Sequence, residues 1–534
     1  MAYSRVCVQR RKHRSILPTR ADMQYASRPS TSSRSALVFR LAGPLVLGIA
    51  VTVSAQQDVR PTDTLRFPLA TLVGTALRNN LDLRAAELSP RLAGADLLAA
   101  RGVFDRSLTL ATANDVSSLD VFGTSSRSSR SFIESTATLA GTVPTGTQLA
   151  LSLGNSRLSS DPFTASSSQP FQTSHASSVG LTLTQPLLRG MGRAGAYGAV
   201  DAAAVSVDAS RSRYERNADV TVALVERGYW ALRRAESNEI VARQAVSAAR
   251  AIYDRNVALQ TRDVATQLDV LTSERGLATR EAQLLDAARE RVDAAERLLY
   301  LVYGEEAKDS VRAQGARVYT LRDSVVIPPV PDVAAAEAIA FAQRGDIIAT
   351  SRDVEAGRLR SAQSRSLRLP VLDLIASYAY GGIAPTSTFV QFGDTGDRRS
   401  STFSFGLTTS LFQRNDAARA ADERAQSALE LARLSQRAVE NAVHAEVSTA
   451  VRALATGRER YARARDVERL AAREYALALE GSRLGLVSTF QLLQYQDALS
   501  QGGQLVAQAR FALEDAGSQY RLAIGGSRLG YPRP

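Results

Sequence analysis

The stretch Leu484-Gly485-Leu486-Val487-Ser488-Thr489-Phe490-Gln491-Leu492-Leu493 decides the fold of this chain. A long Ala-rich helical pattern runs into Gly485, and a second helical pattern starts directly after it. Gly is the residue expected just past a helix end, because it adopts positive φ without a Cβ penalty. Ser488 stands where an N-cap oxygen would accept the free N–H groups of the next helix. We therefore predict a tight turn between two long helices.

The same pattern occurs a second time, earlier in the chain and at one constant offset. Asp is among the few residues other than Gly that tolerate the left-handed region, so Asp263 can replace Gly485. This offset is far longer than a solenoid repeat, so it indicates a duplicated half-protein. The matching pairs are Tyr253 and Tyr475, Asp263 and Gly485, Thr266 and Ser488, Asp269 and Gln491, and Gly304 and Gly526.

A further match, at a larger offset, pairs the segment 76–83 with the segment 340–347. The helical pattern of residues 67–102 surrounds the first copy, so the duplication starts near residue 68. Matching segments are thus farther apart at the start of the two halves than at the helical turns. This difference indicates extra sequence between the helices of the first half.

The extra sequence has the period-two alternation of β-strands with one apolar face. Ser-rich loops are expected at 115–131 and 155–178, with a turn at Pro144-Thr145-Gly146. The second half shows only two such strands, 372–380 and 403–408. Segments of about ten alternating residues with polar loops are typical of a membrane β-barrel. The alternating apolar residues of the first half are Leu108 and Leu110, then Leu149, Leu151 and Leu153, then Val179, Leu181 and Leu183.

Long helical patterns follow each set of strands, at about 197–260 and 416–482, each on the order of 100 Å long. The second has two stripes, which indicates a neighbour on each side and favours a wall of helices over a bundle with one solid core. One stripe is a heptad seam of small residues, Ala421, Ala425, Ala428, Ala432, Ser435, Val439 and Ala442, and the other comprises Val443, Val447, Ala450 and Leu454.

The number of strands limits the assembly. Four or six strands are too few to close a barrel, and open sheet edges are not tolerated in lipid, so several copies must share one barrel. If the segments near 133–143 and 147–155 both cross the membrane, three copies give eighteen strands. If they extend or fold over the other strands, three copies give twelve.

The start of the chain resembles a secretory leader. Residues 1–55 contribute +8 to the net charge of +12, so most of the basic excess lies in this segment. The charge therefore does not indicate that the rest of the chain binds nucleic acid. The apolar segment 41–53 is too short to span a bilayer, and the small residues Val53-Ser54-Ala55 predict cleavage before Gln56, although Met23 is an alternative start. The only cysteine, Cys7, lies in this leader, so no disulfide and no cysteine metal site is expected.

Motifs that could carry chemistry have simpler interpretations here. The segment 190–195 has the form GxGxxG but lacks the second parallel strand of a dinucleotide fold, so we interpret it as a strand-to-helix joint. His13, His175 and His444 are isolated from one another, and no nucleophile or carboxylate pair can be argued. We therefore predict no enzyme activity, no catalytic residue, no cofactor and no metal.

The order of these parts resembles the TolC family of outer-membrane channels from efflux pumps and type I secretion systems. The resemblance covers roughly residues 66–526 and includes Gln185-Pro186-Leu187-Leu188-Arg189-Gly190 and the turn at Gly485. It implies a mainly α fold in which each half has a helix, strands and a long helical hairpin. It also implies a homotrimer whose β-barrel in outer-membrane lipid continues into a periplasmic α-helical tunnel, and it favours twelve strands.

The resemblance divides the chain into successive parts. We expect a leader (1–55), a first repeat (56–304) with strands at about 105–187 and a hairpin at about 197–304, an equatorial linker (305–331), a second repeat (332–526) with strands at about 370–412 and a hairpin at about 416–526, and a C-terminal tail (527–534).

The resemblance also implies that both helical turns lie at the periplasmic entrance, where an adaptor protein and an inner-membrane transporter assemble with the channel. Leu484-Gly485-Leu486 resembles the adaptor-docking turn of the family, whereas residues 262–264 depart from it. At the positions where the family commonly has acidic side chains, this chain has Gln491 and Gln494. The expected entrance residues are Asp263, Thr266, Asp269, Leu484, Gly485, Leu486, Ser488, Gln491 and Gln494, although capping alone also explains Thr266 and Ser488.

Two functions of different classes follow from the sequence. One is a passive export conduit, and the other is a structural or adhesive coiled-coil protein of the cell envelope. The alternating strands favour the conduit, because a periplasmic coiled coil needs no lipid-facing Phe403, Phe405 and Leu407. The exported substrate and the energy source of the partner pump, proton flux or ATP, stay open.

Overall fold

The computed structural model describes residues 65–120, 127–160, 172–304, 318–320, 329–384, 398–411, 413–528 and 531. The predicted leader and most of the predicted linker lie outside these residues. The chain divides into the units Met1–Pro61 and Thr62–Pro534, and all described residues belong to the second.

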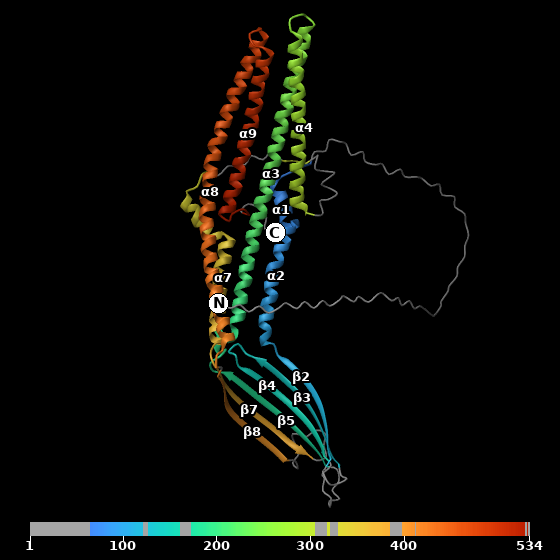
Figure 1. Ribbon diagram of the computed structural model, residues 1–534, viewed down its shortest axis with the longest axis vertical. Coiled ribbons are helices and arrows are strands. Elements are labelled where there is room, and N and C mark those ends of the chain that lie inside the picture. The colour runs from blue at the N-terminus through green and yellow to red at the C-terminus, as the bar shows by residue number, and fades with distance from the viewer. Residues whose placement is uncertain are drawn as a thin grey trace, which may run out of the picture. The chain divides into compact units, whose positions relative to one another are not determined.

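Two long helical hairpins and one sheet dominate the second unit (Figure 1). The first hairpin pairs α3 (Gly198–Gln260) with α4 (Gln267–Tyr303), and the second pairs α8 (Asp416–Arg483) with α9 (Thr489–Ala523). The two turns lie at the same end, away from the sheet. The remaining helices are α1 (Leu69–Asn79), α2 (Leu81–Arg101), α6 (Val333–Gln343) and α7 (Gly345–Leu367), and a short parallel pair joins β1 (Leu65–Phe67) to β6 (Val318–Thr320).

The helix predicted at 67–102 is broken at Asn80, and the equivalent helix of the second half is broken at the matching position, Arg344. Asn80 Nδ2 donates to the carbonyl oxygen of Leu301 at 3.0 Å, and Arg344 Nη1 donates to that of Ala523 at 3.1 Å. Leu301 and Ala523 are separated by the same offset as the left-handed residues of the two turns. The donors Asn80 and Arg344 are separated by the larger offset found in the sequence, and the acceptors Leu301 and Ala523 by the smaller one. The two halves of the chain therefore make the same contact.

The helices form a wall in which α3 is central. Next to the sheet the neighbours follow the order α2, α3, α7, α8, and near the turns they follow α4, α3, α9, α8. The stripe predicted to be apolar on α8, from Val443 to Leu454, is buried against the rest of the chain. The heptad seam from Ala421 to Ala442 is exposed or half-buried, so no helix among the described residues covers it fully.

One antiparallel sheet contains all six long strands, in the order β2, β3, β4, β5, β7, β8. Their bounds are β2 Ser107–Asp120, β3 Arg127–Thr142, β4 Gln148–Ser160, β5 Gln172–Pro186, β7 Val371–Ala384 and β8 Arg398–Ser410. Each neighbouring pair is joined over twelve or more residues. Within the described residues, β2 and β8 pair on one side only, so they are the two edges of the sheet.

This sheet corrects two expectations from the sequence. The Ser-rich stretches 115–131 and 155–178 are strand over much of their length, because ladder hydrogen bonds are made by the backbone and continue where apolar side chains end. The sheet of one chain also has six long strands where the resemblance favours four, because β3 and β4, which flank the turn at Pro144-Thr145-Gly146, are inserted between β2 and β5 as full members of the sheet.

Candidate functional site

The two helical turns have the same backbone conformation. Asp263 and Gly485 have φ of 60° and 78°, which confirms the predicted left-handed residues. Val264 N donates to Leu259 O at 3.0 Å in the first turn, and Leu486 N donates to Gly481 O at 2.8 Å in the second. Each turn thus closes its helix with the same backbone hydrogen bond, at equivalent positions of the two repeats.

Both turns are followed by a capping box. Thr266 Oγ1 and Ser488 Oγ each accept a hydrogen bond from the backbone N–H three residues later, which confirms the predicted N-caps. The Asp269 carboxylate and the Gln491 amide oxygen accept in return from the N-cap backbone, both at 3.1 Å. Hydrogen bonds from Thr266 lower the pKa of Asp269, so this carboxylate carries its charge at neutral pH.

The turns of the two hairpins are connected by side chains that the sequence patterns did not indicate. Asn256 on α3 is buried, and its Nδ2 donates to Asp269 O at 3.4 Å and to Thr489 Oγ1 at 3.3 Å. Arg255 Nη2 donates to Ser482 O at 2.6 Å. These contacts hold the start of α4, the end of α8 and the start of α9 together as one tip.

The surface of this tip carries several exposed apolar side chains among polar ones. Leu484 and Leu486 are 70% and 79% exposed, and Val264 and Leu268 in the first hairpin are exposed to a similar degree. Gln491 and Gln494 are exposed on α9, whereas Asp269 is half-buried on α4. Exposed apolar side chains that gather at one place mark an interaction surface.

The six-stranded sheet has one apolar face. Cross-strand partners lie on the same face, so the register defines rows of residues that cross all six strands. One such row is Leu108, Leu139, Leu151, Leu181, Tyr378 and Phe403, and the rows on either side of it include Leu110, Leu153, Leu149, Leu183 and Phe405. Most of these side chains are 39–73% exposed.

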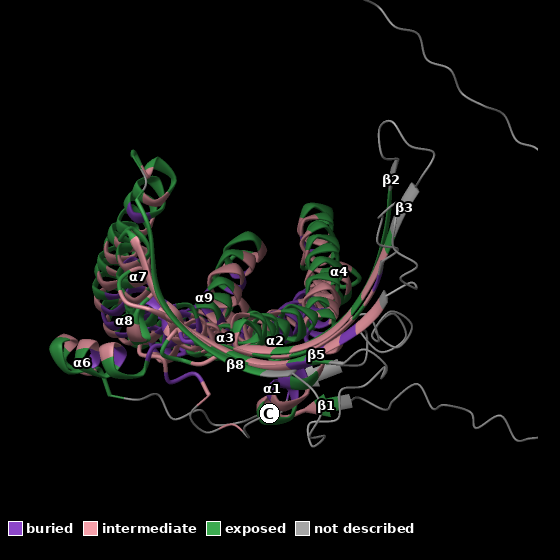
Figure 2. Ribbon diagram, turned by 90° about the horizontal axis from the view of Figure 1, so that it is seen from below, coloured by how far each residue is buried: buried purple, intermediate pink, exposed green. Residues whose placement is uncertain are grey.

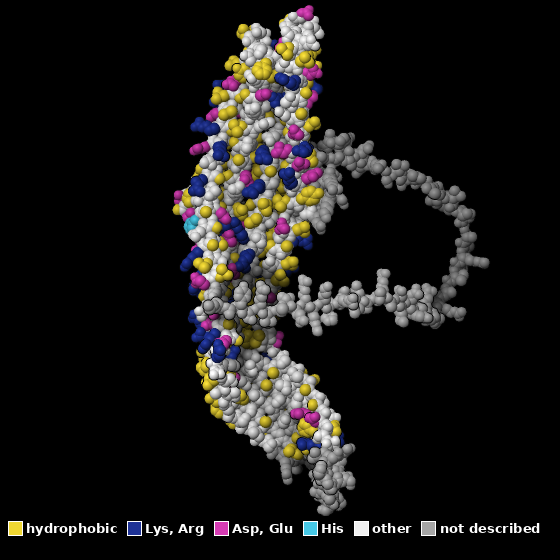
Figure 3. Space-filling model, in the orientation of Figure 1, with side chains coloured by type: hydrophobic (Ala, Val, Ile, Leu, Met, Phe, Trp, Pro, Cys, Tyr) yellow, Lys and Arg dark blue, Asp and Glu magenta, His cyan; other side chains and the backbone are white. Residues whose placement is uncertain are grey.

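The central part of the opposite face consists of small, mostly polar side chains. The sheet is curved (Figure 2), and its concave side, turned toward the viewer in Figure 3, is mostly white because Ser, Thr and Gly dominate it. Three consecutive rows on this face contain only Gly, Ala, Ser or Thr. They are Ser107, Ala140, Ala150, Thr182, Ser377 and Ser404; Thr109, Thr138, Ser152, Gly180, Ala379 and Thr402; and Ala111, Thr136, Gly154, Ser178, Gly381 and Ser400.

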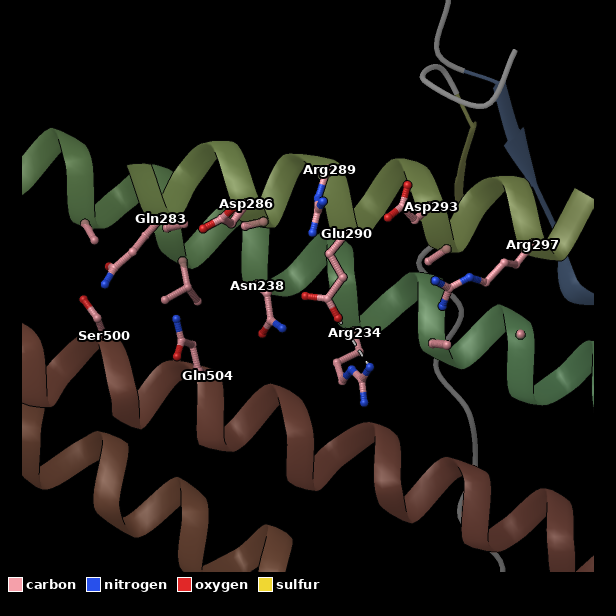
Figure 4. Close-up of a pocket in the computed structure, with 17 residues that line it drawn as sticks. Arg234, Asn238, Gln283, Asp286, Arg289, Glu290, Asp293, Arg297, Ser500 and Gln504 are labelled. Carbon is pink, nitrogen blue, oxygen red and sulfur yellow. Dashed lines mark hydrogen bonds and ion pairs between the residues drawn. The ribbon is translucent and has the colours of Figure 1, made fainter. Parts of the chain in front are cut away.

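A polar groove of about 790 Å³ lies between the two hairpins and is lined by α3, α4 and α9 (Figure 4). Both acidic and basic side chains lie along α4, and Arg234 on α3 pairs with Glu290 on α4 at 3.5 Å. The Asn238 amide and Ser500 also line it. The groove therefore brings opposite charges close together on a polar surface.

The remaining motifs have structural roles. Residues 190–195 lie between β5 and α3, where Gly190 and Gly192 have φ of 75° and 72°, so the GxGxxG motif is a strand-to-helix joint. His175 lies on β5, and His444 on α8 is 3.1 Å from Glu337. Among the described residues, no cluster of three or more His, Cys, Asp or Glu side chains could hold a metal ion.

None of the helices in the described part of the chain has a segment long and apolar enough to cross a membrane.

Comparison with known proteins identifies the fold. No protein-family model matches the sequence, and no curated protein is significantly similar to it. Solved outer-membrane channels do share the structure. The channel OprN has a TM-score of 0.63 and 18% identity, with 86% of this chain and 90% of that chain covered.

Two further structures, an outer-membrane channel and an outer-membrane protein, have nearly the same TM-score. CmeC of Campylobacter jejuni has 0.62 with 15% identity, covering 86% of both chains, and VceC of Vibrio cholerae has 0.62 with 14% identity, covering 86% of this chain and 96% of that one. The chain therefore has the fold of TolC-like outer-membrane channels, as the sequence resemblance predicts.

Proposed function

We propose that this chain is a subunit of an outer-membrane channel, a passive conduit that exports molecules from a periplasmic and inner-membrane machine to the exterior. The single observation that carries the proposal is the two-faced sheet. A row of Leu, Tyr and Phe side chains on one face, with Ser, Thr and Gly on the other, suits a wall with lipid outside and water inside.

The edges of the sheet support assembly from several copies. The strands alternate in direction, so β2 and β8 run antiparallel to each other, and each has one unpaired edge among the described residues. Unpaired backbone groups in lipid cost several kcal/mol each, so these edges require partners. Pairing β8 of one copy with β2 of the next closes a ring, and three copies make the homotrimer that the shared fold favours.

The helices support the same assembly. The exposed seam on α8 from Ala421 to Ala442 lies on an edge helix of the wall, and α2 at the other edge exposes Leu88 and Leu92. Small residues on one helix and Leu on another allow close packing between copies. The helical wall of three copies would form the tunnel, on the periplasmic side of the membrane.

The tip, with its exposed Leu and Val side chains, is the proposed entrance and docking site for an adaptor protein. It includes all nine residues expected from the sequence: Asp263, Thr266, Asp269, Leu484, Gly485, Leu486, Ser488, Gln491 and Gln494. Their capping roles are compatible with docking, because capping fixes the turn while Leu484 and Leu486 face solvent. Efflux pumps and type I secretion systems both fit this arrangement.

The alternative, an envelope coiled coil without transport, does not account for the sheet. A water-exposed sheet would not carry a full row of large apolar side chains, flanked by further Leu and Phe, on a face that the described residues leave exposed.

Reconstitution of the purified full-length protein into planar bilayers tests the proposal. We expect discrete conductance steps from a detergent-extracted, heat-modifiable oligomer. A protein that stays in solution without detergent and gives no conductance would support the envelope coiled coil instead.

A further inference from the structure

The inserted hairpin β3–β4 adds two strands to the four that the sheet would have without it. Its turn is closed by a hydrogen bond from Val143 N to Thr147 O at 2.9 Å, and it lies beside the strand-to-helix joint. A Cβ on Gly146, whose φ is 90°, would lie 3.0 Å from Gly190 O. The turn is therefore packed at the helical end of the sheet, and both of its strands run the full length toward the other end.

The insertion preserves the two faces of the sheet. Leu108 of β2 and Leu181 of β5 lie in one row, connected through Leu139 and Leu151 of the hairpin. Removal of β3 and β4 would bring Leu108 opposite Leu181, with the same face outward. The hairpin therefore adds width to the sheet without changing its register or its lining.

We propose that this hairpin widens the exit barrel to eighteen strands with a neutral lining of small side chains, so that bulky, hydrated cargo of any charge can leave. The inference rests on the proposed function, because it requires three copies that close one barrel.

The circumference of the helical wall agrees with the wider barrel. Eighteen strands about 4.8 Å apart and tilted by about 40° give a ring of roughly 110 Å, whereas twelve give roughly 75 Å. Three copies of the four helices next to the sheet, at about 9 Å between axes, give roughly 110 Å. An eighteen-stranded barrel thus continues the tunnel without narrowing it.

The lining favours the same class of cargo. The three rows of Gly, Ala, Ser and Thr are the smallest side chains available, so they leave the lumen free. They carry no charge, and rings of charged side chains are what select ions in narrow pores. Charged residues of the polar face lie beyond these rows, with Asp115, Arg130 and Glu134 toward one end of the strands and Asp373 at the other.

The test compares the full-length protein with a variant lacking residues 127–160, both in planar bilayers. Polyethylene glycols of graded size are added on the external side, and the largest that lowers conductance is recorded. We expect the limiting polymer radius to be about one and a half times larger for the full-length protein, since barrel diameter grows with strand number. Equal limits in the two proteins would overturn the inference.

Cysteine labelling in cells keeps the test valid if the shortened variant does not assemble. Thr145→Cys should be labelled only from the periplasmic side, whereas Arg130→Cys in β3 and Arg157→Cys in β4 should be labelled only from outside. Labelling of all three from one side would show that the hairpin does not cross the membrane. Absence of any conductance would refute the proposed function, whereas conductance with equal limits refutes only the wider barrel.

Discussion

Neighbouring residues on β8 offer a matched pair of substitutions. Phe405 belongs to the apolar face and is 69% exposed in the single chain. Ser404 belongs to the polar face, where its hydroxyl lies 2.6 Å from that of Ser377. Both side chains are exposed in the chain alone, so only the surroundings of the assembled sheet can make an arginine at these positions cost different amounts.

The expected cost of Phe405→Arg is large. An arginine on the lipid face costs about 2–4 kcal/mol near the bilayer midplane. Loss of the ring removes roughly 140 Å² of apolar area from lipid, which at about 25 cal/mol per Å² is worth roughly 3.5 kcal/mol. Ser404→Arg places its charge in a water-filled lumen and loses one hydroxyl contact, at about 1 kcal/mol.

The assay is the yield of heat-modifiable oligomer in the membrane fraction, together with its melting temperature in detergent. We expect Phe405→Arg to reduce the yield severely and Ser404→Arg to leave it near that of the unmodified protein. Equal yields of the two variants, or a greater loss for Ser404→Arg, would refute the assignment of the apolar face to lipid.

Three further predictions concern the helices. Arg344 is 2% exposed and its Nη1 lies 2.6 Å from a carboxylate oxygen of Glu446, so Arg344→Met should destabilise the protein by about 2–4 kcal/mol, seen as a lower melting temperature that Arg344→Lys partly restores. Burial raises the pKa of Glu514 to about 7, so its folded-state proton is bound more tightly and stability falls as pH rises from about 4.5 to 7. Glu514→Gln should therefore stabilise the protein at pH 8 by up to about 3 kcal/mol, seen as a higher melting temperature, and leave the melting temperature unchanged at pH 4. A higher melting temperature at both pH values would contradict this. At the entrance, Gln491 is neutral, so trivalent cations should block the channel weakly and Gln491→Asp should strengthen the block, as measured by conductance with and without the cation; strong block of the unmodified protein that persists in Asp269→Asn would contradict it.

Local features of the chain could be predicted from the sequence. The left-handed conformation of Asp263 and Gly485 and the N-cap positions of Thr266 and Ser488 depend on residues within one turn, so their chemistry is visible in a short window. The period of the apolar residues likewise located the long helices to within a few residues at each end.

The contacts that connect distant segments could not be predicted. Asn256 meets Thr489 across 233 positions and Arg344 meets Ala523 across 179, and no periodicity reports such pairs. The strand β3 was missed in part because its first residues, from Arg127 to Ser131, are polar on both faces. Strand pairing is decided by backbone groups of other segments, which a single stretch of sequence does not show.

Cross-linking between the two edges of the sheet tests the central claim most directly. The only cysteine of the chain, Cys7, lies in the predicted leader, so Ala111→Cys in β2 can be combined with a cysteine at Thr402, Ser404 or Gly406 in β8. All of these positions lie on the polar face. Under oxidation, at least one pair should give covalent dimers and trimers on a denaturing gel and no larger species, because β8 of each copy pairs with β2 of the next in a closed ring of three. Cross-links confined to single chains, or a ladder that continues beyond three, would contradict a membrane barrel shared by three copies.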